Sequence, residues 1–382
     1  MVESAPWHPT PPAMQLKLVA LALAALPNLA SSAPQAPIEA IDTWGLRDVE
    51  RAAVMAELGF AVGDDGEVDR EAARARLEAL EGIEQARIVE MLMGPQRIML
   101  VGVRERGRGI RELLPPPTGE LRLRGAILEA YERSMELLEE AMAAGVWGED
   151  HVDGYALSKY EPRRELELTM VPVARAELDS IVEVLRECAD ARHRAAAAWA
   201  LAFADDKARI ARELTRAAFD GDSAVRNNAT RALGILIDHS IANPELDLRV
   251  DPAPFVAMLE SIEWTDLNKA SFVLMSLTSR PDEALYAQLR ATALDGLADI
   301  ARWTSQGHAY PALLTLGRLA GLDDDSLRAR LEESSTDRSD RDRLVDELLV
   351  RARAAGSVEG AEQPLGELDG DAGSQDLDVH PL

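Results

Sequence analysis

The sequence predicts an α-solenoid of helical repeats preceded by a small α+β domain with elements in the order β-α-α-β-β. Segments 190–202 and 222–234 align without gaps at a spacing of 32 residues, and self-similarity at such a fixed period is typical of a solenoid. Residues 37–105 instead mix runs of period-two hydrophobicity with short amphipathic segments, which indicates a separate unit. Aromatic residues make up only 4% of the chain, a composition that favours close-packed helices over β-sandwiches.

The charge of the chain limits the kinds of partner it can have. Asp and Glu number 67 against 41 Lys and Arg, and the formal net charge of the 382 residues is -26. Nucleic-acid phosphates and anionic lipids are bound through Lys and Arg, so neither is expected as a partner. Cys188 is the single cysteine, which excludes an intrachain disulfide and a zinc site built on several thiolates. We predict neither a metal nor a cofactor.

The N-terminal residues 1–33 resemble an export signal. Lys17 precedes an apolar run over 18–26, and small residues follow as far as Ala33. This is the order of a basic, an apolar and a cleavage region, and the run is too short to span a bilayer. We expect a Sec-type signal that begins at Met14, an upstream extension before it, and a periplasmic or secreted mature protein without a stable membrane span. The alternative is a buried Ala- and Leu-rich helix of the folded domain.

Residues 36–106 are predicted to form the α+β domain. Alternating apolar and polar residues indicate strands, Gly-Pro at 94–95 indicates a turn, and apolar residues at helical spacing indicate helices. We expect strands over 37–44, 86–92 and 97–103 and helices over 46–58 and 70–80.

This domain resembles the POTRA, or polypeptide-transport-associated, family. The resemblance rests on Gly45-Leu46 after the first strand, Leu58-Gly59-Phe60, Leu80 to Ile83, and Val101 to Glu105. It implies an extracytoplasmic domain that binds other chains, partly by adding a strand to the edge of its sheet. This chain carries a single copy, and the alternative is a small α+β domain whose sheet is only structural.

A proline-rich linker over 107–120 separates this domain from the helical repeat domain over 121–355. Three consecutive prolines at 115–117 forbid a helix and favour an extended chain. Residues 146–160, which include His151 and Asp153, are predicted to form an irregular solvated loop. We expect helices over 121–144 and 327–355, with the first helices of the repeats over 174–187, 206–219, 252–262 and 281–303.

The second helix of each repeat carries the repeated residues. Small residues recur three apart, where neighbouring helices must approach closely, and Asp190 and Asp222 are placed to cap the helices. Arg194 and Arg226 lie in the first turn, where a cation gains nothing from the helix dipole. Each is therefore expected to pair with an Asp of its own or an adjacent repeat.

The string from Asp222 to Gly234 resembles the short variety of HEAT-like repeats, and partial copies lie at 190–202 and 305–317. The resemblance implies an architecture used mostly for protein binding, although some short HEAT-like proteins are lyases that handle bilin chromophores. Cys188, the single thiol, is expected to be a buried structural residue.

Five residues are candidates for partner binding or for contacts between repeats. They are Arg194, Arg226, Asn227, Asn228 and Trp264. The two asparagines extend a polar row beside Arg226, and the indole could line a groove or pack in the core. No residue of the sequence is assigned a catalytic role.

Residues 356–382 contain no Lys or Arg and are rich in Asp, Glu and Gly, so we expect a disordered acidic tail. The leading hypothesis is a non-catalytic extracytoplasmic scaffold that binds another protein through its solenoid and a sheet edge. The alternatives are a lyase-type enzyme built on the same repeats and a salt-adapted intracellular adaptor.

Overall fold

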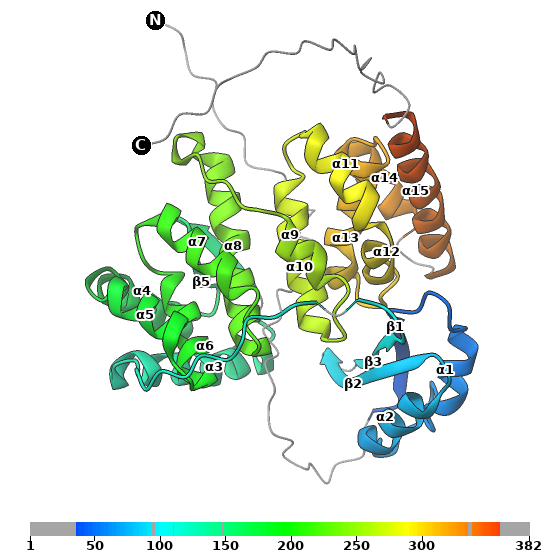
Figure 1. The fold of residues 1–382 in the computed structure, drawn as a ribbon, viewed down its shortest axis with the longest axis horizontal. Helices are drawn as coiled ribbons and strands as arrows, with labels where there is room; N and C mark the ends of the chain where they lie inside the picture. Colours follow the sequence, from blue (N-terminus) through cyan, green and yellow to red (C-terminus); the bar gives the residue numbers. More distant parts are fainter. Residues whose placement is uncertain (1–35, 94–95, 110, 147, 335–337, 360–382) are drawn as a thin grey trace, which may run out of the picture.

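A computed structural model describes residues 36–359 apart from 94–95, 110, 147 and 335–337. A small α+β module lies against one side of an array of helices (Figure 1). The predicted export signal, the Gly-Pro turn and nearly all of the predicted acidic tail lie outside the described residues. No helix among the described residues is long and apolar enough to cross a membrane.

The module has the predicted order of strands and helices. Its sheet has the order β1-β3-β2, with β1 parallel and β2 antiparallel to β3. The resemblance of this module to POTRA domains stays a prediction. The elements are β1 (Ile38–Trp44), α1 (Arg51–Glu57), α2 (Arg70–Ala79), β2 (Ile83–Met93) and β3 (Gln96–Glu105).

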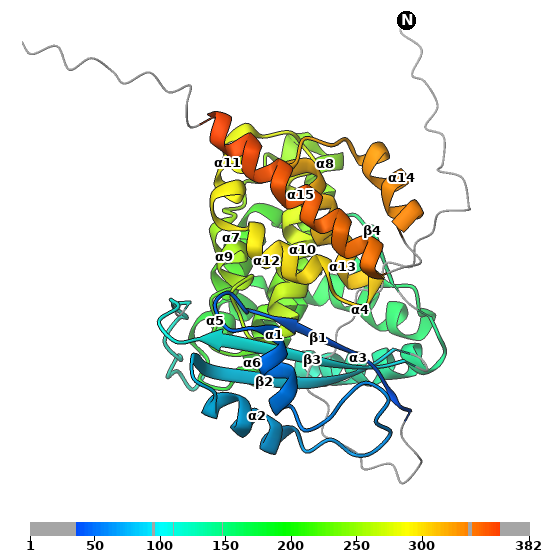
Figure 2. The same ribbon diagram turned by 90° about the vertical axis from the view of Figure 1, so that its right-hand side faces the viewer.

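Both faces of this sheet are buried, because strand side chains alternate between the two faces. One face, with Ile41 and Val101, packs against α1 and α2. The other, with Trp44 and Leu100, joins the core of the helical array. Figure 2 shows the sheet between α2 and the array. At Gly102 an added Cβ would lie 2.4 Å from the Trp44 ring and 2.6 Å from the Ile262 carbonyl oxygen, so only glycine permits this close approach.

The helical array is built from pairs of helices whose second members form a continuous inner layer. In this layer α6 packs on α8, α8 on α10, and α10 on α13. The second helices are α6 (Ala191–Leu201), α8 (Ser223–Ala242), α10 (Trp264–Leu277) and α13 (Gln306–Leu319). The first helices are α5 (Leu178–Glu187), α7 (Lys207–Ala217), α9 (Ala253–Met258), and the consecutive α11 (Glu283–Thr292) and α12 (Leu294–Ala301).

Capping residues determine where the second helices begin, and small side chains determine how closely these helices pack. The carboxylates of Asp190 and Asp222 accept hydrogen bonds from backbone N–H groups of the first turn, which caps α6 and α8. The run from Ala195 to Leu201 is buried all round, since small side chains let helices approach on every side. A helix buried in this way cannot be stable alone and depends on its neighbouring repeats.

The segment predicted to be an irregular loop forms a β-hairpin instead. Strands β4 (Glu149–Val152) and β5 (Tyr155–Ser158) pair in antiparallel register. Their turn is Asp153-Gly154, with φ of 52° and 72°, and Asp-Gly is a preferred pair in tight hairpin turns because both residues need positive φ. This prediction was wrong because the strands are only four residues long and their alternation was not recognised.

Two predicted helices are each broken in two. The segment 174–187 divides between α4 (Glu161–Ala176) and α5, and the segment 281–303 divides between α11 and α12. No Pro or Gly marks either break, and the second half of each pair turns to pack on α6 and α13 respectively. The remaining helices are α3 (Gly125–Ala143), α14 (Asp324–Ser334) and α15 (Arg338–Glu359), so helix extends past Gly356, where the tail was predicted to begin.

Candidate functional site

Arg194 and Arg226 form buried ion pairs between successive repeats. Two guanidinium nitrogens of Arg194 lie 2.8 Å from the two carboxylate oxygens of Asp220, which lies just before α8. The guanidinium of Arg226 binds Asp266 in the first turn of α10 at 2.8–3.1 Å. Each arginine also donates to carbonyl oxygens of the turn before its own helix. Both predicted residues therefore connect repeats and are buried away from solvent.

The other three predicted residues are also buried. Asn228 donates to the hydroxyl of Tyr131 on α3 and to the carbonyl of Ala195 on α6, whereas the Oδ1 atom of Asn227 has no partner among the described residues. Trp264 packs edge-on against His308, with ring centroids 5.6 Å apart. In this structure none of the five is available for direct contact with a partner, and four of them link neighbouring helices.

The linker occupies the end of the array at which α6, α8 and α10 begin. Residues 111–123, which we call the strap, run along this end toward α3 (Figure 1). The strap N–H of Leu114 donates to Phe219 at 2.7 Å, and the N–H of Gly119 donates to Glu187 at 2.8 Å. Arg111 lies over the Phe219 ring and 3.7 Å from Asp266, and burial lowers its pKa to about 10. The array thus already holds an extended segment of its own chain.

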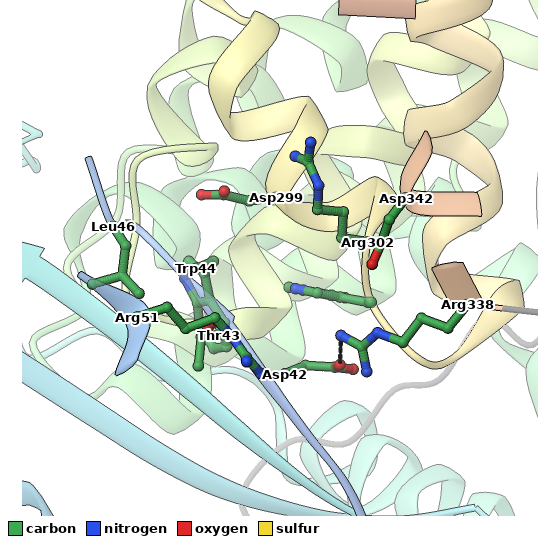
Figure 3. Close-up of a pocket in the computed structure, with 10 residues that line it drawn as sticks. Asp42, Thr43, Trp44, Leu46, Arg51, Asp299, Arg302, Arg338 and Asp342 are labelled. Carbon is green, nitrogen blue, oxygen red and sulfur yellow. Dashed lines mark hydrogen bonds and ion pairs between the residues drawn. The ribbon is translucent and has the colours of Figure 1, made fainter. Parts of the chain in front are cut away.

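A polar cavity of ≈ 310 Å³ lies where the module meets the array (Figure 3). In it, the carboxylate of Asp42 on β1 accepts the N–H and hydroxyl of Thr304 at 2.7 and 2.8 Å and an ion pair from Arg338 at 3.0 Å. The lining residues come from β1, the segment after it, α1, α12, the turn that follows α12, and α15: Asp42, Thr43, Trp44, Leu46, Arg51, Asp299, Arg302, Trp303, Arg338 and Asp342.

The charged groups of this cavity mostly bind one another across the junction. Asp299 on α12 accepts hydrogen bonds from the Gly45 N–H and from Arg47, both at 2.9 Å, so each side supplies a carboxylate to the other. Burial raises the pKa of Asp42 and of Asp299, although both carboxylates have cationic partners. These ion pairs and hydrogen bonds hold the module on the array, so we assign them a structural role.

Strand β2 presents an open edge to solvent. One edge of β2 pairs with β3. The N–H and C=O groups of successive residues point to opposite edges of a strand, so those of Ile88, Glu90 and Leu92 point outward, away from β3. The outward N–H of Ala86 is satisfied by the Glu78 carboxylate at 3.2 Å. In the described part of the chain, the outward groups of the other three residues form no hydrogen bond. The side chain of Leu92 beside them is 57% exposed.

Sequence reasoning found the possibility of an open edge but missed the junction. Asp42 and Thr304 are 262 residues apart in the chain, Trp44 and Ser261 are 217 apart, and no local pattern couples either pair. A signal did exist in Gly102, a glycine inside a strand, since such residues often mark a close approach of another segment.

Residues 178–256 match the family model for HEAT repeats. This match places HEAT repeats within residues 178–256, where the structure shows the stacked helix pairs of an α-solenoid. Among solved structures, the chain is similar to a designed armadillo repeat protein in complex with the peptide (KR)4, at 12% identity and a TM-score of 0.35. That similarity covers 58% of this chain and 98% of the designed one. No curated protein matches.

Proposed function

We propose that this protein is a non-catalytic scaffold that binds an extended segment of another polypeptide along the open edge of β2. Helical-repeat solenoids typically serve as protein-binding scaffolds, which supports the general class. The observation that carries the specific proposal is the set of three consecutive outward N–H and C=O pairs at Ile88, Glu90 and Leu92. A strand that pairs with these groups gains main-chain hydrogen bonds, which is the basis of binding by strand addition.

The array is proposed to support this edge. Because the back of the sheet is part of the main hydrophobic core, β2 is held in a fixed orientation and loses little freedom on binding. The strap occupies one end of the array, and the predicted contact residues are buried, so the structure favours the sheet edge over the ends of the second helices as the docking site.

Replacing Leu92 with proline should weaken binding by tenfold or more, because proline removes an outward N–H without removing a hydrogen bond to β3. Leu92→Ala removes the same side chain but keeps the N–H, and should stay within about threefold of the unchanged protein. The measurement is fluorescence anisotropy of a 12-residue peptide selected on the full chain from a random library. Equal affinity for the two variants would exclude strand addition at this edge.

We also propose that the protein acts outside the cytoplasm. The support is the order of Lys17, the apolar run and Ala33 in the sequence, together with the resemblance of the module to an extracytoplasmic family. N-terminal sequencing of the protein purified from its native cells should begin at Pro34. A chain that retains residues before Ala33 would contradict export by cleavage.

A further inference from the structure

The cavity between the module and the array is lined by acidic and basic side chains in equal number. Its lining contains three aspartates and three arginines, and most of these charges are already paired. Asp42 binds Arg338 at 3.0 Å within the cavity. Asp299 binds Arg47 of the module at 2.9 Å, and Arg302 binds an aspartate further along α15. Two charged residues of the lining are left, one on the module and one on the array.

Arg51 on α1 is the charged residue that the module contributes. Its Nε atom donates to the Thr43 hydroxyl and its Nη2 atom to the Ile41 carbonyl oxygen, both at 3.1 Å, which fixes the guanidinium beside β1. Within the described part of the chain, Arg51 forms no ion pair. A guanidinium has more N–H groups than these two bonds use, so Arg51 keeps donors for a ligand.

Asp342 on α15 is the charged residue that the array contributes. Its Oδ1 atom is buried, and the carboxylate forms neither a hydrogen bond nor an ion pair with a described residue. Two arginines lie near it in the chain but bind elsewhere, since Arg338 binds Asp42 and Arg341 donates to the carbonyl of Trp303. A buried acceptor without a donor costs free energy, so this oxygen calls for a partner that the described residues do not supply.

The cavity is large enough and open enough to admit a small molecule. Its volume of ≈ 310 Å³ lies at the lower end of the range for ligand sites, which is about 300–1,000 Å³. Arg51 and Arg338 are both exposed at its rim, so the cavity is accessible from solvent. Figure 3 shows the side chain of Asp342 entering the view from the upper right and that of Arg51 from the left. A ligand in the cavity can therefore be approached from both parts of the protein.

We propose that this cavity binds a small zwitterion, a molecule that carries one carboxylate and one ammonium group. The carboxylate accepts hydrogen bonds from the remaining N–H groups of Arg51, and the ammonium donates to the unpartnered oxygen of Asp342. The charges of the lining are balanced, so a ligand without net charge preserves the balance, whereas a simple anion or cation satisfies only one of the two residues.

This ligand connects the module to the array, because Arg51 and Asp342 belong to different parts of the protein. Its binding therefore stabilises the junction. The site lies beside β1, at the opposite edge of the sheet from β2, so the inference does not depend on the proposed function.

The test is the thermal unfolding of the full chain with ω-amino acids of increasing length, from glycine to 6-aminohexanoate, at pH 7. Acetate and methylammonium, which each carry one of the two charges, are compared at the same concentration and ionic strength. We expect at least one amino acid of the series to raise the melting temperature by roughly 2 °C or more above its value with either singly charged ion.

Two variants and two matched controls locate the effect. Asp342→Asn and Arg51→Gln each remove one of the two charges and should lower the apparent affinity for that amino acid by roughly tenfold or more. Asp340→Asn on the same helix and Arg74→Gln on α2 change residues outside the lining and should keep the effect.

Asp342→Asn is expected to fold, because it replaces a carboxylate that has no ion pair with an amide of the same shape. Three results would overturn the proposal: no rise with any amino acid of the series, an equal rise with acetate or methylammonium, or the same rise in either variant as in the unchanged protein. If Asp342→Asn does not fold, Arg51→Gln at the exposed start of α1 provides the same comparison against Arg74→Gln.

Discussion

Replacing Arg226 with alanine should lower the free energy of unfolding by about 3–5 kcal/mol, because the change removes the cation that is hydrogen-bonded to the buried carboxylate of Asp266. Asp266 is 1% exposed, and Arg226 supplies three of its hydrogen bonds. The same guanidinium holds the turn before α8 through the carbonyls of Asp220 and Gly221. Urea unfolding followed by circular dichroism measures the effect.

Two further variants separate the loss of this pair from general damage. Arg216→Ala changes an exposed arginine on α7 and should alter the free energy by less than about 0.5 kcal/mol. Arg226→Met combined with Asp266→Leu removes both charges of the pair and should recover part of the lost stability. The recovery is only partial because Arg111, 3.7 Å from Asp266, loses this carboxylate as a partner. A loss below about 1 kcal/mol in Arg226→Ala would show that the pair does not join the repeats as described.

Replacing Trp44 with alanine should destabilise the protein by about 3–5 kcal/mol and weaken the junction between module and array. The indole is 1% exposed, donates to the carbonyl of Ser261 at 2.9 Å and lies 5.5 Å from the ring of Trp303. Hydrogen exchange measured by mass spectrometry should be faster over residues 261–304, because the indole of Trp44 no longer covers this part of the array.

Val54→Ala is the matched control for the junction. Val54 lies on α1 and is fully buried in the core between this helix and the opposite face of the same sheet, so its truncation weakens the module but not its contact with the array. Exchange over 261–304 should then stay near that of the unchanged protein. Equal protection of this segment in Trp44→Ala and in the unchanged protein would contradict the role given to the indole.

The repeats could be predicted from the sequence because their signals are local. Asp222 caps a helix within three residues of itself, and the small residues that follow recur at the spacing of one helical face. The acidic partner expected for Arg226 is supplied by Asp266, although the sequence did not specify which acid. The order of strands and helices in the module could likewise be predicted, because apolar and polar residues alternate in its strands.

The features that the sequence did not reveal depend on contacts between distant segments. Asp42 meets Thr304 and Trp44 meets Ser261 only after the array has folded, and neither pair has a spacing rule. The breaks at Glu177 and Ala293 follow the packing of α5 and α12 on their neighbours, since no residue there disfavours a helix. The burial of Asn228 and Trp264 under neighbouring elements could not be read from helical periodicity, which identifies faces but not what covers them.

The open edge of β2 can be tested residue by residue by amide hydrogen exchange, followed by NMR on the full chain with and without a peptide selected on it. Strand addition predicts new protection at Ile88, Glu90 and Leu92, whose N–H groups point outward, and little change at Arg87, Val89 and Met91, which already pair with β3. Protection confined to the helices of the array, with the three outward amides still exchanging freely, would contradict binding at this edge.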